Sequence, residues 1–212
     1  GNWKQILSRM DTLADESVYA EYLKTLVPVF PEVIKRGRSE VSLNLLRLLG
    51  AHSRNVLAEA PGRTTLAREA LESFSSEANL AHLIGDAKSP ERERRQTAFE
   101  CLQLIGEPAV GSLLELLWRS TSASVRRETV AILEFLGEDV YVPLMEVLGT
   151  KHLEWYVYRN AVLLAAKTDC EAASDDVCKY LSHPHPRVRE EAISALSHFR
   201  GKSAMLDFVP LL

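Results

Sequence analysis

The chain has 212 residues, of which 46% are hydrophobic and 25% charged, and its 29 acidic and 25 basic residues give a formal net charge of -4. These proportions exclude a disordered or low-complexity chain, because enough apolar surface is present to offset the entropy lost on ordering. The apolar runs, such as the one at Leu113–Trp118, are a few residues long, far short of the roughly 20 residues of a membrane span.

The first part of the chain predicts helices of irregular spacing. An apolar stripe over residues 3–13, beginning at Trp3, predicts an amphipathic helix that caps the fold. A second apolar helix is expected over residues 16–35, with a kink or break at Pro28 and Pro31 because proline cannot donate a backbone hydrogen bond.

Two further segments carry a weak form of the pattern that dominates the rest of the chain. Residues 38–50 form one block, and a second block places Leu66, Ala70 and Phe74 on one helical face. We expect this second block to pair with a helix at residues 55–60, before the Pro61-Gly62 turn.

From residue 80 onward the sequence repeats itself. Four similar helical blocks begin 31, 32 and 31 residues apart, at Arg94, Val125, Val157 and Val188. A second helical register precedes the last three blocks and continues after them, beginning at Leu113, Leu144, Val177 and Phe208. Each unit is therefore predicted to be two antiparallel helices joined by a tight turn.

Small residues and glycines mark fixed places within the blocks. Ala98, Ala161 and Ala192 occupy one position, where a small side chain lets a neighbouring helix approach closely. Gly106 and Gly137 follow their helices, where a left-handed C-cap favours glycine. The third block ends in Asp169 instead, and Gly201 follows the fourth one place later.

The segment Val-Arg-x-x-Ala-x-x-Ala-Leu at Val188–Leu196 resembles the second helix of a HEAT repeat of the PBS-lyase-like kind common in bacterial proteins. The resemblance implies a right-handed α-solenoid of about six helix pairs, with second helices lining the concave side. It also implies an inter-repeat polar ladder at Arg95, Arg126 and Arg189, interrupted by Tyr158.

We expect one repeat domain over residues 1–212, with a cap and weak repeats in 1–79 and clear repeats in 80–212. The chain ends early in what should be another first helix, so we expect a fragment of a longer bacterial protein. An open end of the array would expose apolar surface and favour self-association.

Sequence motifs for catalysis or metal binding are missing. There is no GxSxG, glycine-rich phosphate loop, HExxH or CxxC, and we expect no enzyme activity, no metal and no cofactor. An odd number of cysteines, three, does not form a disulfide framework and favours free thiols in a reducing, cytoplasmic compartment.

Nucleic acid is the alternative partner, because some HEAT-like proteins are DNA glycosylases of the alkylpurine type. Trp155 and its neighbouring tyrosines could stack on bases, with Glu154 as the acid. Interleaved glutamates disfavour this alternative, since duplex binding needs a basic footprint.

The predicted function is that of a protein–protein interaction scaffold, and no membrane contact is expected. Its contact surface would lie on polar residues beside the apolar stripe of the second helices, where charges of both signs suit hydrogen bonds and ion pairs with another protein. The predicted contact residues are Gln96, Glu100, Arg127, Glu128, Arg159, Asn160, Glu190 and Glu191.

Overall fold

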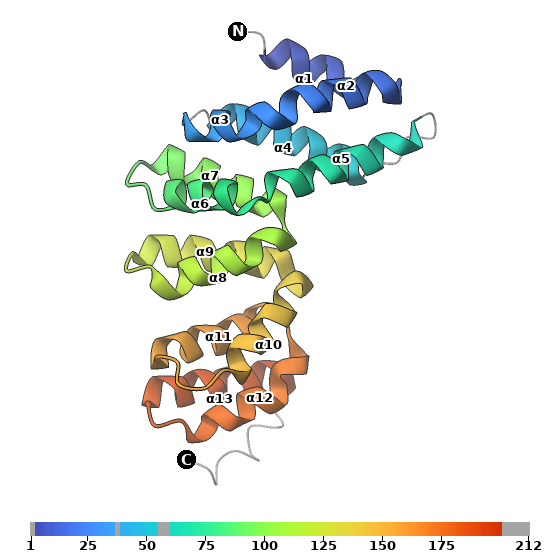
Figure 1. The fold of residues 1–212 in the computed structure, drawn as a ribbon. Coiled ribbons are helices and arrows are strands. Elements are labelled where there is room, and N and C mark those ends of the chain that lie inside the picture. The colour runs from blue at the N-terminus through green and yellow to red at the C-terminus, as the bar shows by residue number, and fades with distance from the viewer. Residues whose placement is uncertain (1–2, 37–38, 55–59, 201–212) are drawn as a thin grey trace. The chain divides into compact units, whose positions relative to one another are not determined.

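The computed structural model describes residues 3–36, 39–54 and 60–200, and the regular elements in these ranges are all helices (Figure 1). The predicted all-α fold is therefore confirmed. The chain divides into two compact units, residues 1–112 and 113–212, which are described in turn. The expected C-cap at Gly201 and the expected helix from Phe208 lie outside the described residues.

The first unit contains the helical segments up to the start of α8. They are α1 (Trp3–Asp11), α2 (Glu16–Leu26), η1 (Val27–Val29), α3 (Phe30–Lys35), α4 (Ser39–Arg54), α5 (Pro61–Phe74), α6 (Glu77–Ala87), α7 (Arg92–Ile105) and η2 (Glu107–Ala109). The break expected at Pro28 and Pro31 is confirmed, because the 3-10 segment η1 holds Pro28 and α3 begins with Pro31 in its first turn.

The interpretation of α5 as a second helix of a short repeat is wrong. In the structure α2 packs on α5 and α3 packs on α6, while α4 packs on both α5 and α7. Helices α5 and α6 are thus two consecutive segments of one long first-helix element, and α7 is their second helix. Pro61 stands in the first turn of α5, where its missing N–H costs nothing, and residues 55–59 lie outside the described residues.

A polar cluster joins α1 and the following turn to α2, α4 and α5. His52 of α4 is buried, with the Tyr19 hydroxyl 2.9 Å from its Nδ1 and an Asp11 carboxylate oxygen 3.1 Å from its Nε2. Arg63 of α5 is also buried, and its guanidinium donates to the carbonyl oxygens of Asp11 and Leu13. The cap predicted at the N-terminus therefore docks through hydrogen bonds as well as through its buried Met10.

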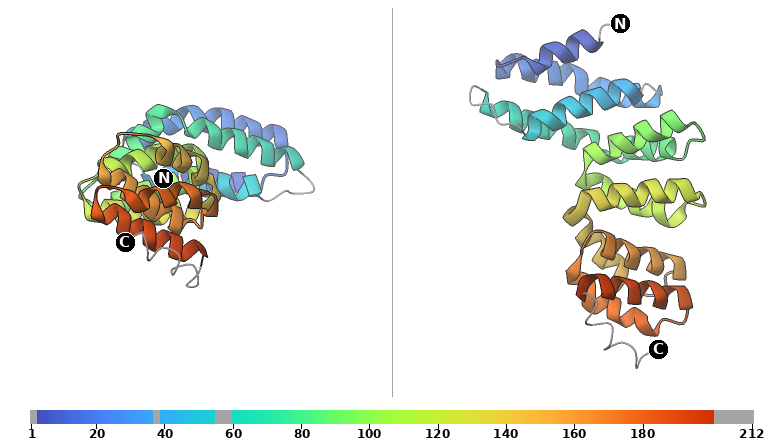
Figure 2. Two further views of the ribbon diagram at one scale, coloured as in Figure 1. Left: turned by 90° about the horizontal axis from the view of Figure 1, so that it is seen from below. Right: turned by 180° about the vertical axis from the view of Figure 1, so that it is seen from behind.

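The second unit holds the clear repeats. Its elements are α8 (Val110–Arg119), which starts at the boundary, α9 (Ala123–Leu136), η3 (Gly137–Val140), α10 (Tyr141–Gly149), α11 (Trp155–Lys167), η4 (Glu171–Ala173), α12 (Ser174–Lys179), η5 (Tyr180–Ser182) and α13 (Pro186–Arg200). Helix α11 packs on its own first helix α10 and on the second helices α9 and α13 (Figures 1 and 2). The predicted stacking of helix pairs is confirmed here.

The small-residue position lies at these helix contacts. Ala98, Ala161 and Ala192 are each fully buried, and so is Thr129 at the same place in α9. Thr129 satisfies its hydroxyl by donating to the Val125 carbonyl one turn earlier, at 2.8 Å. Close packing is thus possible at each of these four positions, which hold either alanine or a threonine whose hydroxyl bonds within its own helix.

The caps predicted at Gly106 and Gly137 have the expected positive φ, but their ψ angles of -137° and -119° lie outside the left-handed helical region, so the prediction of left-handed caps is wrong in this respect. Gly106 and Gly137 have φ angles of 78° and 57°. Asp169, which replaces the glycine after α11, also has a positive φ, of 53°. Aspartate is one of the few residues other than glycine that visit this region, so the repeat geometry survives the replacement.

The arginines expected in an inter-repeat ladder each donate to a carbonyl of the loop that precedes their own helix. Arg126 donates to the Ser120 carbonyl at 2.8 Å, and Arg189 donates to the His183 carbonyl at 2.9 Å, in each case six residues back. Arg95 does the same to Ser89. Tyr158 occupies the equivalent position and donates to the Thr150 carbonyl at 2.9 Å, so it performs the arginine's role with a different group.

Candidate functional site

A groove of about 390 Å³ lies on the second-helix face of the second unit, between α9 and α11. Its α9 wall is one helical face, because Ala123, Arg127, Val130 and Glu134 recur at steps of three and four residues. Its α11 wall is built in the same way by Arg159, Asn160, Leu163 and Lys167. Leu117 of α8, Arg126 and Ala131 complete the lining.

The groove brings together three of the predicted contact residues, Arg127, Arg159 and Asn160. Of the other five, Glu128 of α9 is half-buried, while Glu190 and Glu191 belong to α13, where Glu190 is exposed. Gln96 is exposed on α7 of the first unit. Glu100, also on α7, is engaged by Arg47 of α4 at 2.5 Å.

An ion pair connects neighbouring second helices at the edge of the groove. The Arg159 guanidinium lies 3.1 Å from a Glu191 carboxylate oxygen and 3.4 Å from the Asn160 amide oxygen. Burial raises the pKa of Glu191, and the positive charge of Arg159 opposes this rise. A polar link between repeats therefore exists, one to two residues beyond the positions that the family resemblance indicated.

Positive charge dominates the groove although the chain is acidic overall. Four of its lining residues are cationic, namely Arg126, Arg127, Arg159 and Lys167, and Glu134 is anionic. The Glu134 carboxylate pairs loosely with Lys167 at 3.8 Å. Within the described residues Arg127 makes no hydrogen bond or ion pair, and its side chain is exposed.

The residues missed in the sequence are the aliphatic floor, Val130 and Leu163, and the pair Glu134 and Lys167. Val130 and Glu134 lie three and seven residues after Arg127, and Leu163 and Lys167 lie four and eight residues after Arg159. Helical spacing from the two arginines would therefore have identified all four residues. Guanidinium groups and aliphatic side chains thus line the same groove, a composition suited to a ligand with acidic and aliphatic groups.

The structure also locates the residues considered for metal or nucleic-acid chemistry. No group of three or more metal-ligating side chains is found in the described residues. Trp155 stacks on His185 with ring centroids 3.9 Å apart, so one face of its indole is covered, and Tyr158 is buried. Within the same residues no helix is both long and apolar enough to span a bilayer.

The fold and the groove define an all-α protein of stacked helical repeats. In agreement with this, a family model described as HEAT repeats matches residues 141–209, about a third of the chain. The resemblance recognised at Val188–Leu196 is therefore confirmed.

The solved structures to which the chain is similar include two designed repeat proteins. The designed armadillo repeat protein YIII(Dq)4CqI is 18% identical, with 92% of this chain and 98% of that chain covered and a TM-score of 0.29. The designed armadillo repeat protein YIII(Dq.V1)4CPAF, in complex with the peptide (KR)4, is 17% identical, with 94% and 100% covered and a TM-score of 0.31. No curated protein matches the chain.

Proposed function

We propose that this protein is a non-enzymatic interaction scaffold that holds a segment of a partner protein in the groove between α9 and α11. The observation that carries the proposal is that Arg127, an exposed guanidinium with no hydrogen-bond or ion-pair partner among the described residues, lines the same groove as the aliphatic side chains of Val130 and Leu163. The groove's lining is made of charged, amide and aliphatic side chains, which are groups suited to binding a peptide segment.

The charge of the groove selects the partner. Four cationic side chains against Glu134 favour an acidic segment, and electrostatic complementarity of this kind steers association and sets specificity. The aliphatic floor favours a segment in which acidic residues alternate with apolar ones. Because the walls are helices packed on neighbouring helices, little ordering entropy opposes binding.

The test uses short fluorescein-labelled peptides in which glutamate alternates with leucine, and matched peptides with lysine in place of glutamate. We expect polarisation to report binding of the acidic peptide alone. Arg127→Glu should weaken that binding about tenfold or more, because a charge-assisted hydrogen bond is lost and a repulsive charge is introduced.

The matched control is Arg187→Glu, which changes the same charge on an exposed residue of α13 outside the groove. This variant should bind like the wild type. Equal loss in both variants, or preference for the lysine peptide, contradicts the proposal. A labelled DNA duplex that binds at low salt more tightly than the acidic peptide would favour the nucleic-acid alternative instead.

A reducing compartment, the cytoplasm, is part of the same proposal. Cys101, Cys170 and Cys178 are all free, and Cys101 and Cys170 are buried. Burial raises the pKa of the Cys101 thiol to about 12, which keeps it protonated and unreactive. When cells are quenched in acid and the protein is then alkylated in denaturant, all three thiols should be found reduced, whereas a disulfide in most molecules would contradict this setting.

A further inference from the structure

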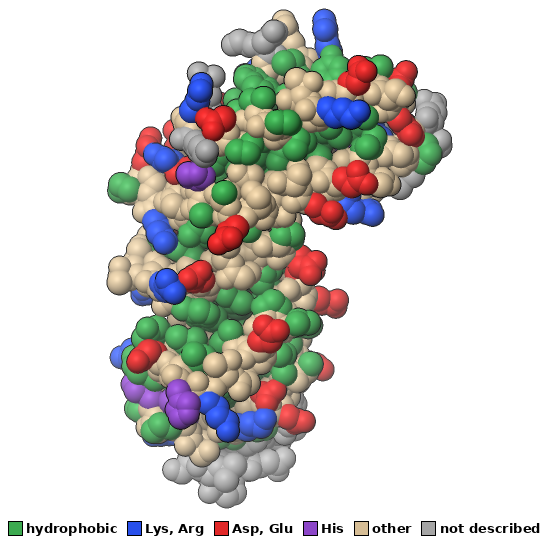
Figure 3. Space-filling view, viewed as in Figure 1, with side chains coloured by type: hydrophobic (Ala, Val, Ile, Leu, Met, Phe, Trp, Pro, Cys, Tyr) green, Lys and Arg blue, Asp and Glu red, His purple; other side chains and the backbone are tan. Residues whose placement is uncertain are grey.

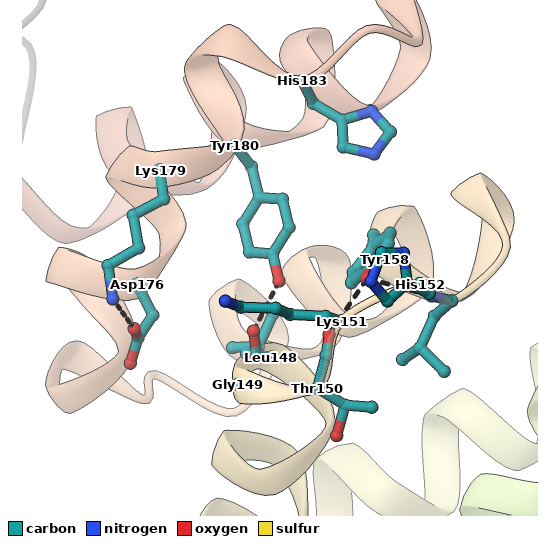
Figure 4. A pocket seen from close by; sticks show the side chains of 11 residues that line it. Leu148, Gly149, Thr150, Lys151, His152, Tyr158, Asp176, Lys179, Tyr180 and His183 are labelled. Atoms are coloured by element: carbon teal, nitrogen blue, oxygen red, sulfur yellow. Dashed lines mark hydrogen bonds and ion pairs between the residues drawn. The ribbon is translucent and has the colours of Figure 1, made fainter.

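A second cavity, of about 540 Å³, lies at the loop end of the repeats formed by α10, α11 and α12 (Figure 4). The end of α10 and the loop after it form one wall, and α12 and η5 form the other. Figure 3 shows histidine and basic side chains gathered together on the visible face of this unit. The volume is typical of pockets that hold small organic ligands.

The loop that forms one wall is held in an uncommon conformation. His152 has a φ of 64°, although it is not a glycine and does not directly follow a helix. Two tyrosines fix this loop: Tyr158 donates to the Thr150 carbonyl and accepts from the Leu153 N–H at 3.0 Å, and Tyr180 donates to the Leu148 carbonyl at 2.6 Å. Such conformations cluster at binding sites, where the surrounding structure maintains them.

Two polar groups in the cavity lining, on His183 and Lys151, are donors without a partner in the part of the chain that the structure describes. His183 accepts the His185 N–H on its Nδ1 at 3.1 Å, so the neutral ring carries its proton on Nε2. Within the described residues neither this Nε2–H nor the Lys151 ammonium has a hydrogen-bond or ion-pair partner. The Lys179 ammonium lies 2.5 Å from Asp176. Both tyrosine hydroxyls already donate to the backbone.

We propose that this cavity binds a small organic oxyanion, a carboxylate or phosphate monoester with an apolar body. Its anionic group would contact the His183 Nε2–H and the Lys151 ammonium, which within the described residues have no partner; Figure 4 shows the Lys151 side chain extended toward Lys179, so this flexible side chain would turn toward His183 on binding. Its apolar body would contact Leu148, Leu153 and the edges of the tyrosine rings. The proposal stands apart from the α9–α11 groove, because the two cavities share no lining residue.

The test is an NMR titration of the full chain with phenyl phosphate, phenylacetate, inorganic phosphate and benzyl alcohol. We expect saturable backbone shifts at residues 148–153 and 176–183 with phenyl phosphate, phenylacetate or both, and the stronger of the two identifies the head group. Inorganic phosphate, which lacks the apolar body, and benzyl alcohol, which lacks the charge, should bind at least about tenfold more weakly.

Two variants test whether the proposed donors bind the ligand without disturbing the fold. Lys151→Met removes an exposed charge, and His183→Asn removes the Nε2–H while its amide oxygen can still accept the His185 N–H. Each should weaken binding about tenfold, whereas Lys88→Met, on an exposed lysine of the first unit, should not. Absent shifts at the pocket with both organic anions, equal binding of benzyl alcohol, or unchanged affinity in both pocket variants would overturn the proposal.

Discussion

His52 illustrates how a single buried side chain determines the pH response of the first unit. Its ring lies between the Tyr19 hydroxyl and the Asp11 carboxylate, and Arg63 stands over the Tyr19 ring, 5.9 Å from its centroid. Burial lowers the pKa of His52 below its ordinary value of 6.5, although its hydrogen bond to Asp11 opposes the shift. Accepting the tyrosine proton on Nδ1 also requires a neutral ring.

The sign of the resulting pH dependence follows from this lowered pKa. The contribution of neutral His52 is fully present above pH 6.5 and is lost as the pH falls from there through the folded-state pKa. We expect urea unfolding to give a lower free energy of unfolding at about pH 5 than at about pH 7.

The comparison that isolates His52 is His52→Gln measured at the same two pH values. His183 also has a pKa lowered by burial, and it contributes with the same sign in both proteins. The fall in stability should therefore be smaller in His52→Gln than in the wild type. An equal fall in the two proteins would show that His52 does not titrate as described.

At the scale of helices, the contact between α11 and α13 depends on the small-residue position. Ala161 and Ala192 are fully buried there, and Val188 and Leu196 are buried on the same face of α13. Close-packed interiors tolerate added volume poorly, because the extra atoms force neighbours off their preferred rotamers.

Ala192→Leu should therefore destabilise the second unit by about 1–3 kcal/mol in thermal or urea unfolding. Ser194→Leu introduces the same side chain on an exposed position of the same helix and should change stability by no more than about 0.5 kcal/mol. A melt of Ala192→Leu that superimposes on that of the wild type would contradict the packing register.

Elements with regular spacing were predictable from the sequence, whereas others depend on tertiary packing. The period of about 31 residues predicted α9, α11 and α13, and the proline pair predicted the break at η1. The role of α5 was mistaken because its apolar spacing fits either layer of a helix pair. The packing of α5 on α2 and of α6 on α3 shows that α5 belongs to the layer of first helices. Such contacts between segments distant in the chain leave no signal in the local sequence.

At the scale of the whole molecule, the groove between α9 and α11 was also only partly predictable from the sequence. Sequence spacing placed Arg127, Arg159 and Asn160 on second helices, and in the structure these three residues line one groove. The charge balance of the groove was not predictable, because Glu191 and Arg159 neutralise one another while Arg127 makes no ion pair with any residue that the structure describes. A chain with a net charge of -4 thus presents a local positive groove.

The measurement that tests the scaffold account most directly is methyl NMR of the full chain with the glutamate-leucine peptide. We predict shifts of the Val130 and Leu163 methyl groups on the groove floor, and loss of these shifts in Arg127→Glu. Val188 and Leu196, buried in the α11–α13 contact, should stay unchanged. Shifts confined to residues outside the α9–α11 groove, or shifts of the same size in Arg127→Glu, would contradict the account.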